Sequence, residues 1–484
     1  MVDVDAVVVG SGPNGLAAAV TLARAGLSVH VVERADTIGG GARTAELTLP
    51  GFRHDVGSAV HPMALASGFF RRFELQRRME LVVPELSYGH PLDGGRAGLA
   101  WHDLERTVDD LGRDGEAYRR IMAPLVHRAD RLAQFTLSPL LQVPRHPLTT
   151  VLFGLAALEQ GSPAWNARFA EEVAPAMLTG VAAHAIQRMP SLATAAVALT
   201  LGAHAHARGW PVPIGGSQSI ADAMADDLLA HGGIISTGVD VASLNDLPRA
   251  TATLLDVNPR AMLDIAGDLL PHRYHRRVER FRFGNAAAKV DFALSGPVPW
   301  TNAALAAAGT LHLGGTRREI AQTEAEVNAG RHSTNPYVLV SQPSTIDPGR
   351  APAGRHVLWT YTHVPSGSEI DQSEAITAQI ERFAPGFRDL ILASVGTTAA
   401  QMQRNNPNYV GGDISAGAAT FGQLVARPVL STDPWRTPAE GLYLCSSSTP
   451  PGPGVHGMAG YHAARSALAH EFGIHSGPSL AIGG

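Results

Sequence analysis

Two periodicities alternate at the beginning of the chain. Residues 4–9 form a run of mostly β-branched apolar side chains, which is typical of a buried parallel strand. Residues 13–26 place apolar side chains at helical spacing and end at a glycine, and residues 27–33 return to a β-branched run. This order predicts a strand, a helix and a second parallel strand, which together make a βαβ unit of about thirty residues.

Similar elements recur far along the chain. A helix followed by a strand is predicted within residues 210–244, and a further apolar strand within residues 253–257. Near the end of the sequence, residues 442–445 are predicted to form a strand, and a Ser/Pro/Gly loop leads from them to a helix that begins near Val455. We expect these segments to join the first βαβ unit in one parallel sheet.

The intervening segments have different patterns. Residues 100–208 are helical in pattern, whereas residues 286–296 and 337–344 alternate in the manner of strands. Because 484 residues exceed the size of a single core, we predict an α/β protein of two domains.

Glycines mark the turn between the first strand and the first helix. Gly10, Gly12 and Gly15 have the GxGxxG spacing, with Pro13 and Asn14 inside the turn. In a βαβ unit these glycines allow a tight turn, a close approach of the backbone to a pyrophosphate, and close packing of the helix on the strand. Free N–H groups at the helix start then face the phosphate charge. The motif therefore predicts a dinucleotide site.

An acidic residue follows at the distance that this motif requires. Glu33 ends the second strand, 18 residues beyond Gly15. A carboxylate at this place accepts hydrogen bonds from an adenosine ribose and would repel a 2′-phosphate. The nucleotide is therefore expected to carry an unphosphorylated ribose.

A second glycine cluster distinguishes between possible dinucleotides. Gly40 and Gly41 lie between Arg34 and Arg43, just after the predicted ribose-binding acid. This extension resembles that of FAD-binding amine oxidases and phytoene desaturases, in which the loop and its arginine lie along the pyrophosphate and the flavin. The resemblance implies FAD. We expect the FAD to be bound non-covalently, because the only cysteine, Cys445, is predicted to be a structural residue on an apolar strand.

The C-terminal segment, residues 437–472, resembles the C-terminal FAD motif of the phytoene desaturase-like flavoproteins, although Ser446 stands where carotenoid desaturases usually have a glycine. The stretches IERFAPGF and NPNYVGGDI are similar to a poorly characterised subgroup with a pyridine-nucleotide-disulphide-oxidoreductase domain. The resemblance implies a Rossmann-type, glutathione reductase-like FAD-binding domain that comprises residues 1–75, 210–270 and 405–484. It also implies a mixed α+β substrate domain that comprises residues 76–209 and 271–404. It also implies further FAD contacts from distant segments, at Val241 (through its backbone, to the adenine), Ser447, Val455, Gly457 and Met458.

Three residues are candidates for the chemistry. Lys289 is the only lysine among 38 lysines and arginines, and it resembles the strand lysine that holds a water at flavin N5 in flavin amine oxidases. The alternative is a strand-edge lysine paired with Asp291. His61, in a loop that this family folds toward the flavin, and His456, at the start of the flavin-facing helix, are candidates for proton transfer, with an ordinary loop histidine as the alternative.

Composition and charge exclude several other classes. A net charge of −5 and a pI of about 6.5 provide no basic surface for nucleic acid. One cysteine excludes an internal disulfide, and no histidine pair has convincing metal spacing, so no metal site is predicted. Residues 191–207 are apolar but too often interrupted to span a membrane. We expect a cytoplasmic protein, with peripheral contact between an apolar cavity mouth and a membrane as an open alternative.

Together these features predict an FAD-dependent oxidoreductase of the desaturase or dehydrogenase type. It is expected to move a hydride between flavin N5 and a C–H bond of a hydrophobic, isoprenoid or lipid-like small molecule, with oxygen or a quinone as the electron acceptor. Two alternatives stay open at this point. One is a redox-neutral, flavin-dependent isomerase, and the other is a non-catalytic FAD-binding assembly protein.

Overall fold

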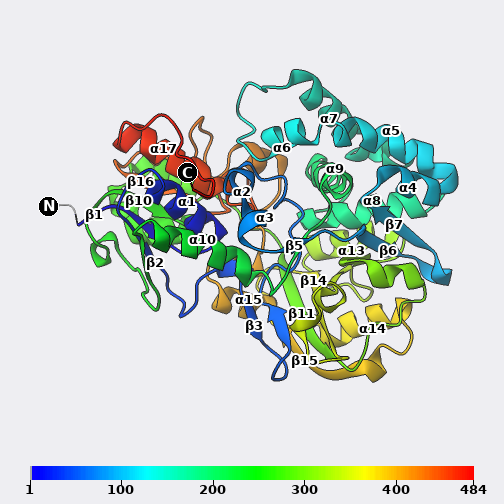
Figure 1. Ribbon diagram of the computed structural model, residues 1–484. Helices are drawn as coiled ribbons and strands as arrows, with labels where there is room; N and C mark the ends of the chain where they lie inside the picture. The colour runs from blue at the N-terminus through cyan, green and yellow to red at the C-terminus, as the bar shows by residue number, and fades with distance from the viewer. Residues whose placement is uncertain (1–2, 484) are drawn as a thin grey trace.

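The computed structural model describes residues 3–483, in which two large sheets lie side by side (Figure 1). The first sheet has five parallel strands in the order β16-β10-β1-β2-β9. Its strands come from the beginning, middle and end of the chain. They are β1 (Val4–Val9), β2 (Val29–Val32), β9 (Ile234–Ser236), β10 (Ala250–Leu255) and β16 (Leu442–Leu444).

Both faces of the first sheet are buried, which explains its continuous apolar strands. Ala6 and Val8 pack against α1 (Pro13–Ala23), α10 (Gln218–Ala230) and α17 (Met458–Glu471). Val7 and Val9 point to the opposite face, toward α11 (Pro259–Ala266) and α12 (His272–Val278). The α/β fold class predicted from the sequence is confirmed.

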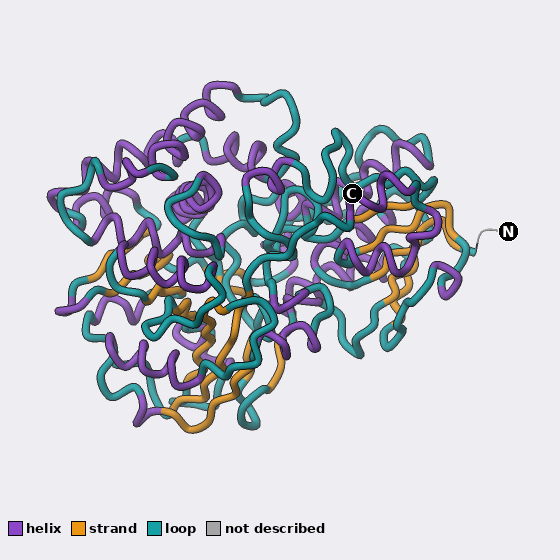
Figure 2. The backbone as a smooth tube through the Cα atoms, turned by 180° about the vertical axis from the view of Figure 1, so that it is seen from behind, coloured by secondary structure: helices purple, strands orange, loops and turns teal. Residues whose placement is uncertain are grey.

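The second sheet has seven strands in the order β15-β11-β14-β13-β12-β6-β7, and it is antiparallel except where β12 pairs with β6. Loops fill much of the space between the two groups of strands (Figure 2). The strands are β6 (Leu86–Pro91), β7 (Ala97–Trp101), β11 (Ala286–Leu294), β12 (Thr310–Leu313), β13 (Val338–Ser341), β14 (His356–Val364) and β15 (Ile391–Thr397).

Helices cover the second sheet on both faces. On one face, α14 (Ser373–Phe383) packs on Val290 and Phe292 of β11. The other face, which includes Leu339 and Tyr361, packs against a helical layer. That layer contains α4 (Leu104–Asp110), α5 (Gly115–Val126), α6 (Ala129–Thr136), α7 (Pro147–Gln160), α8 (Val173–Ala182), α9 (Leu192–Ala207) and α13 (Arg317–Asn328).

Small elements connect the two sheets. They include the hairpin β3 (Thr44–Glu46) and β4 (Arg53–Asp55), the short pair β5 (Leu81–Val82) and β8 (Val212–Pro213), and the helices α2 (Gly68–Arg72), α3 (Leu75–Arg78), α15 (Ala399–Asn405) and α16 (Phe421–Val425). Across residues 3–483, no helix is both long enough and apolar enough to cross a bilayer.

Several element boundaries differ from the sequence prediction. The strand β9 ends at Ser236, so Val241 lies in the loop beyond it and not on a strand. The C-terminal helix α17 begins at Met458, three residues later than predicted, because Pro453 and two glycines with positive φ, Gly454 and Gly457, keep the preceding backbone out of the helix.

Candidate functional site

A cavity of about 1010 Å³ extends between the two large sheets. One end is lined by the β1–α1 turn, the end of β2 and the loop before α17, and the other end by α7, α9 and strands of the second sheet. We call the first end the cradle and the second end the apolar half. A ligand in the cradle would therefore share one space with a ligand against the second sheet.

The N-terminus of α1 faces the cradle. Gly12 begins the helix without a side-chain cap, and Gly10 has a φ of 99°, a value that only glycine adopts readily. A Cβ on Gly12 would lie 2.9 Å from Asp256 Oδ2, and a Cβ on Gly15 would lie 2.1 Å from the carbonyl oxygen of Gly10. Glycine is therefore required at both positions, and the helix start is open to an anionic ligand.

Glu33 is held rigidly at the end of β2. Its Oε2 accepts hydrogen bonds from the Ser11 backbone N–H (2.8 Å) and hydroxyl (2.7 Å), and its Oε1 accepts one from the Ala35 N–H (2.8 Å). The side chain lines the cradle, as do Arg34 and Val241. The carboxylate is thus oriented in advance for a ligand with hydroxyl donors.

The second glycine cluster packs directly on the first. A Cβ on Gly40 would lie 3.0 Å from Gly12 Cα, and a Cβ on Gly41 would lie 2.2 Å from the Tyr409 hydroxyl. Arg43 Nε donates a hydrogen bond to the Gly40 carbonyl (2.9 Å), which holds the guanidinium at the cradle wall. Two glycine loops and an arginine therefore converge on one elongated space.

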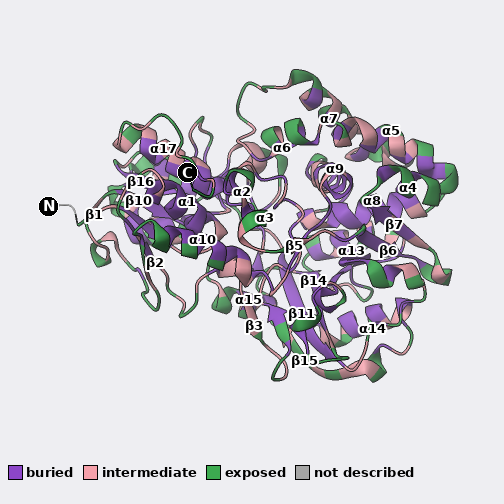
Figure 3. Cartoon of the chain, in the orientation of Figure 1, coloured by how far each residue is buried: buried purple, intermediate pink, exposed green. Residues whose placement is uncertain are grey.

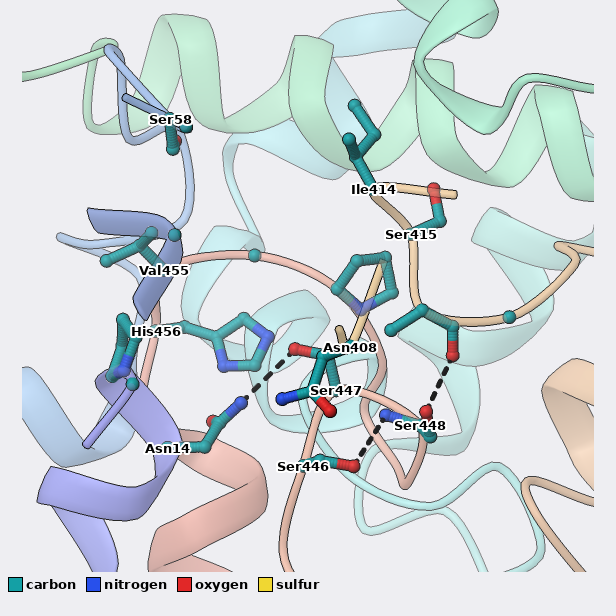
Figure 4. A pocket seen from close by; sticks show the side chains of 18 of the residues that line it. Asn14, Ser58, Asn408, Ile414, Ser415, Ser446, Ser447, Ser448, Val455 and His456 are labelled. Carbon is teal, nitrogen blue, oxygen red and sulfur yellow. Dashed lines mark hydrogen bonds between the residues drawn. The ribbon is translucent and has the colours of Figure 1, made fainter. Parts of the chain in front are cut away.

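The loop before α17 forms the opposite wall of the cradle (Figure 4). Asn14 Nδ2 donates a hydrogen bond to Ser447 Oγ (3.2 Å), whereas its buried Oδ1 has no partner among the described residues. Ser447 and Val455 line the cavity. By contrast, Gly457 and Met458 lie behind the wall, where Met458 Sδ accepts a hydrogen bond from the Phe69 N–H (3.3 Å).

Two buried residues of the cradle could not be identified from the local sequence pattern. Arg427 is 1% exposed and donates hydrogen bonds to the backbone carbonyls of Ser415 (2.7 Å) and Ser447 (2.9 Å). Burial lowers the pKa of this arginine to about 10, and the nearby Asp413 opposes the shift. Arg427 therefore places a positive charge in the cavity wall while it holds the loop.

The second such residue, Asp256, follows β10 and lies beneath the glycine turn. Its Oδ2 accepts a hydrogen bond from the Gly15 N–H at 2.9 Å. Burial raises the pKa of this carboxyl to about 7, and the charge of Glu33 adds to the shift, whereas the hydrogen bond from Gly15 opposes it. A titratable group thus shares the helix start with the predicted pyrophosphate site.

Lys289 lies at the junction between the cradle and the apolar half. It is 3% exposed on β11, an interior strand, and forms an ion pair with Asp291. Asp291 also lies 3.5 Å from His54 Nδ1. Burial lowers the pKa of Lys289, while the negative charges of Asp291 and Asp55 oppose this shift. Lys289 is therefore paired with Asp291, as in the alternative interpretation of the sequence. It also lines the cavity, however, and it does not lie at a sheet edge.

His61 and His456 also line the cavity, and burial lowers the pKa of each to about 4. His61 Nε2 lies 2.8 Å from Ser217 Oγ, whose own hydrogen is donated to the Ser58 carbonyl. This requires the proton of His61 to be on Nε2. His456 Nδ1 accepts a hydrogen bond from the Met458 N–H (3.1 Å), so its proton is also on Nε2. Both rings are neutral at pH 7.

The apolar half has a different character. Its lining residues come from α7, α9 and the second sheet, and most of them are aliphatic or aromatic. They include Phe153, Ala157, Leu192, Ala196, Trp210, Leu339, Trp359 and Tyr361. Such a wall favours a hydrophobic ligand.

Comparison with known proteins relates these features to a family. Residues 8–73 match the model of an NAD(P)-binding Rossmann-like domain. Pyridine nucleotide-disulfide oxidoreductase domain-containing protein 2 of Rattus norvegicus is 28% identical, over 95% of this chain and 92% of that protein. Phytoene dehydrogenase of Streptomyces griseus is also 28% identical, over 80% of this chain and 78% of that protein.

The chain is a relative of the phytoene desaturase-like, FAD-dependent oxidoreductases. This confirms the family predicted from the sequence. Solved structures share the fold of this chain at lower identity. Putrescine oxidase is 18% identical with a TM-score of 0.59, and the alignment covers 96% of this chain and 99% of that one. Cyclohexylamine oxidase from Brevibacterium oxydans is 16% identical with a TM-score of 0.60, covering 98% of this chain and all of that one.

Replacement of Glu33 by alanine should weaken FAD binding by about 1 to 3 kcal/mol, the usual effect of losing a hydrogen bond to a charged group. Equilibrium dialysis of the apoprotein against FAD measures the change. The exposed Glu46→Ala is the matched control, and the unfolding midpoint of each apoprotein separates lost contacts from lost folding. Equal FAD affinity in parent and Glu33→Ala would refute the ribose contact.

Ionisation of Asp256 should weaken FAD binding as the pH rises through about 7, because the new charge then repels the pyrophosphate. The affinity for FAD is expected to fall about tenfold for each unit by which the bound pyrophosphate raises the pKa of Asp256 above its value in the apoprotein. Asp256→Asn keeps the acceptor for the Gly15 N–H, and its FAD affinity should be flat from pH 6 to 8.

The same group should affect the stability of the apoprotein. The folded-state pKa lies above the ordinary value of 3.8, so the stabilisation is complete below about pH 4 and is lost as the pH approaches 7. Relative to Asp256→Asn, the parent should therefore lose stability over that interval. If FAD affinity and the free energy of unfolding depend on pH in the same way in the parent and in Asp256→Asn, the titrating group is another residue.

Proposed function

We propose that the protein oxidises or reduces a C–H bond of a hydrophobic small molecule, with FAD bound in the cradle and the substrate in the apolar half. The observation that carries this proposal is the single cavity that joins the two, with Lys289 at their junction. When bound, FAD supplies the hydride chemistry, through its N5 atom. Oxygen or a quinone is the proposed acceptor, since the sequence has only one GxGxxG turn in a βαβ context.

The cradle residues hold the cofactor in this proposal. The start of α1, with Gly10, Gly12, Pro13 and Asn14, holds the pyrophosphate, since the backbone N–H groups of Gly12 and Asn14 have no partner within residues 3–483 and are open to an anion. Glu33 holds the ribose hydroxyls. Arg43, Arg427 and the Asn14 side-chain oxygen supply the remaining polar contacts from the walls: Arg43 and Arg427 offer positive charge, and Oδ1 of Asn14 offers an unpaired acceptor.

Lys289 is the proposed catalytic residue. Its ammonium is buried and fixed by Asp291, so Nζ can hold a proton, or a water, at one place in the cavity wall. Desolvation lowers its pKa, which makes release of that proton easier than from an exposed lysine. Because His61 and His456 are neutral, they contribute hydrogen bonds or accept a proton, and they bring no positive charge to the site.

The outer surface of α7 supports a peripheral membrane contact, which we also propose. Leu148, Val151, Leu155 and Leu158 are 56 to 61% exposed and recur at helical spacing, while Phe153 on the inner side lines the cavity (Figure 3). No charged residue occurs from position 147 to position 158. One helix thus separates the apolar half from an apolar outer surface.

Charges near this helix suit an anionic lipid surface. The loop that leads into α7 carries Val143, which is 90% exposed, and the exposed Arg145. The exposed Arg131 lies on the neighbouring helix α6, and within the described residues neither arginine forms an ion pair. Aliphatic side chains flanked by free cations are typical of surfaces that insert into the interface of a bilayer.

Lys289→Met should retain FAD but react at least about tenfold more slowly, equivalent to roughly 1.4 kcal/mol of barrier. Reoxidation of the dithionite-reduced holoprotein by oxygen and by menadione, followed by stopped-flow absorbance, measures this. Lys289→Arg should also be slow, because a broad guanidinium cannot place one proton or water in the same way.

The methionine variant also leaves Asp291 unpaired in the core, which lowers stability by itself. The double variant Lys289→Met/Asp291→Asn removes the unpaired charge, and it should recover the unfolding midpoint but not the rate. Parent-like rates in Lys289→Met and Lys289→Arg would show that Lys289 is only a structural residue.

The protein should co-sediment with vesicles of phosphatidylcholine and phosphatidylglycerol, more strongly than with phosphatidylcholine alone, and Leu155→Asp/Leu158→Asp should reduce the bound fraction at least about fivefold. Leu229→Asp, at a residue 53% exposed on α10, is the matched control and should bind like the parent. If light scattering instead gives a dimer that the α7 variant converts to a monomer, without vesicle binding by either protein, the surface is a subunit interface.

A further inference from the structure

Several polar atoms of the apolar half have no protein partner among residues 3–483, and two of them, Nε1 of Trp359 and Oγ1 of Thr310, are fully buried. Tyr361 on β14 and His184, just after α8, also line the cavity. Within the same residues, no group forms a hydrogen bond with the Tyr361 hydroxyl or with Nδ1 of His184. Neither of these two atoms is fully buried, although Tyr361 as a whole is only 6% exposed, so a ligand in the cavity can reach the hydroxyl.

These atoms lie along one row of the second sheet that begins at Lys289. Tyr361 is directly opposite Lys289 on the neighbouring strand, and Leu339 and His312 continue the row across β13 and β12. His184 packs on the end of the row, with its Nε2 3.0 Å from Nε2 of His312. Since strands are about 4.8 Å apart, the Tyr361 position is one strand from Lys289 and the histidine pair is about three strands away.

Beyond Lys289, the polar groups of this row are uncharged. Burial lowers the pKa of His184 to about 3 and also lowers that of His312, and burial raises the pKa of Tyr361. The buried Glu324 adds to the rise in the pKa of Tyr361, but its carboxylate is engaged by Nδ1 of His363 at 2.5 Å. All charged lining residues belong to the cradle or to β11, namely Glu33, Arg34, Arg43, Asp240, Asp256, Lys289 and Arg427.

We infer that the substrate is an uncharged apolar molecule bearing a hydroxyl or carbonyl oxygen, and that the Tyr361 hydroxyl donates a hydrogen bond to this oxygen next to Lys289. The inference rests on the proposed function and narrows its substrate class. A pure hydrocarbon would cover this hydroxyl and leave it without a partner, and unpaired buried donors are costly. An ammonium or carboxylate group would enter the apolar half without a free counter-charge, which is more costly.

The location of Tyr361 makes it a specificity-determining residue. A ligand oxygen at Tyr361 is fixed one strand from Lys289, so the adjoining C–H bonds are brought to the junction with the cradle. The aliphatic remainder of the ligand then extends toward α7 and α9, where Phe153 and Ala196 provide apolar contact.

A series of probes with one chain length and different head groups tests this. Isothermal titration calorimetry of the FAD-loaded protein should show that 1-decanol and 2-decanone bind at least about tenfold more tightly than decane, decylamine or decanoate. This corresponds to a difference of about 1.4 kcal/mol in binding free energy. Tyr361→Phe should reduce the gap between decanol and decane to less than about threefold and leave decane binding unchanged. His184→Leu should retain most of the gap.

Other results would overturn the inference. These are equal or tighter binding of decane, decylamine or decanoate, an undiminished gap in Tyr361→Phe, loss of the gap only in His184→Leu, or no binding of any probe. Flavin absorbance of each protein and reoxidation of its dithionite-reduced form are recorded in parallel. If the protein takes up no FAD, the proposed function is refuted whatever the probes do. If the protein is loaded with FAD and redox-active but shows no head-group preference, only this inference is refuted.

Discussion

The close approach of backbone segments around the N-terminus of α1 is the constraint on which the rest of the structure depends. The carbonyl of Gly10 lies where a side chain of Gly15 would be, and the Gly40 loop packs on Gly12. On the opposite side, a Cβ on Gly460 of α17 would lie 1.7 Å from the Asn14 carbonyl. Any side chain at these positions would separate β1, α1 and α17, and would close the part of the cradle where the N–H groups of Gly12 and Asn14 are open to an anion.

Buried charged side chains make the second connection, between the cradle and the second sheet. Asp55 on the β3–β4 hairpin binds Arg350 at 2.7 Å and accepts a hydrogen bond from the Ser217 N–H, while Lys289 and Asp291 form a pair beside His54 of the same hairpin. Buried ion pairs seldom increase stability over apolar packing, because desolvation offsets their attraction. The buried ion pairs at this junction are better explained by their geometric role, because they fix where Nζ of Lys289 lies relative to both ends of the cavity.

The sequence predicts the cradle better than the rest because its signals are local. Glycine spacing, Glu33 and the second glycine cluster all fall within one stretch, and backbone sterics force glycine at those positions. Asp256 and Arg427 escaped prediction because each follows an ordinary apolar or loop segment, and only the folded sheet brings them to the cavity. Gly457 and Met458 do not line the cavity and pack against Phe69, where close packing explains the glycine, so their contact with FAD stays a prediction.

The division of charge along the cavity follows from these two constraints together. The cradle can contain Glu33, Arg43 and Arg427 because backbone amides and carbonyls compensate their charges. The apolar half, between α9 and the flat face of β13 and β14, offers few free backbone groups, so only neutral polar atoms are tolerated there. Lys289 lies on the boundary, paired by a carboxylate on its own strand. A group that we propose to react with a hydrophobic molecule can therefore be charged, because its own strand supplies the compensating carboxylate.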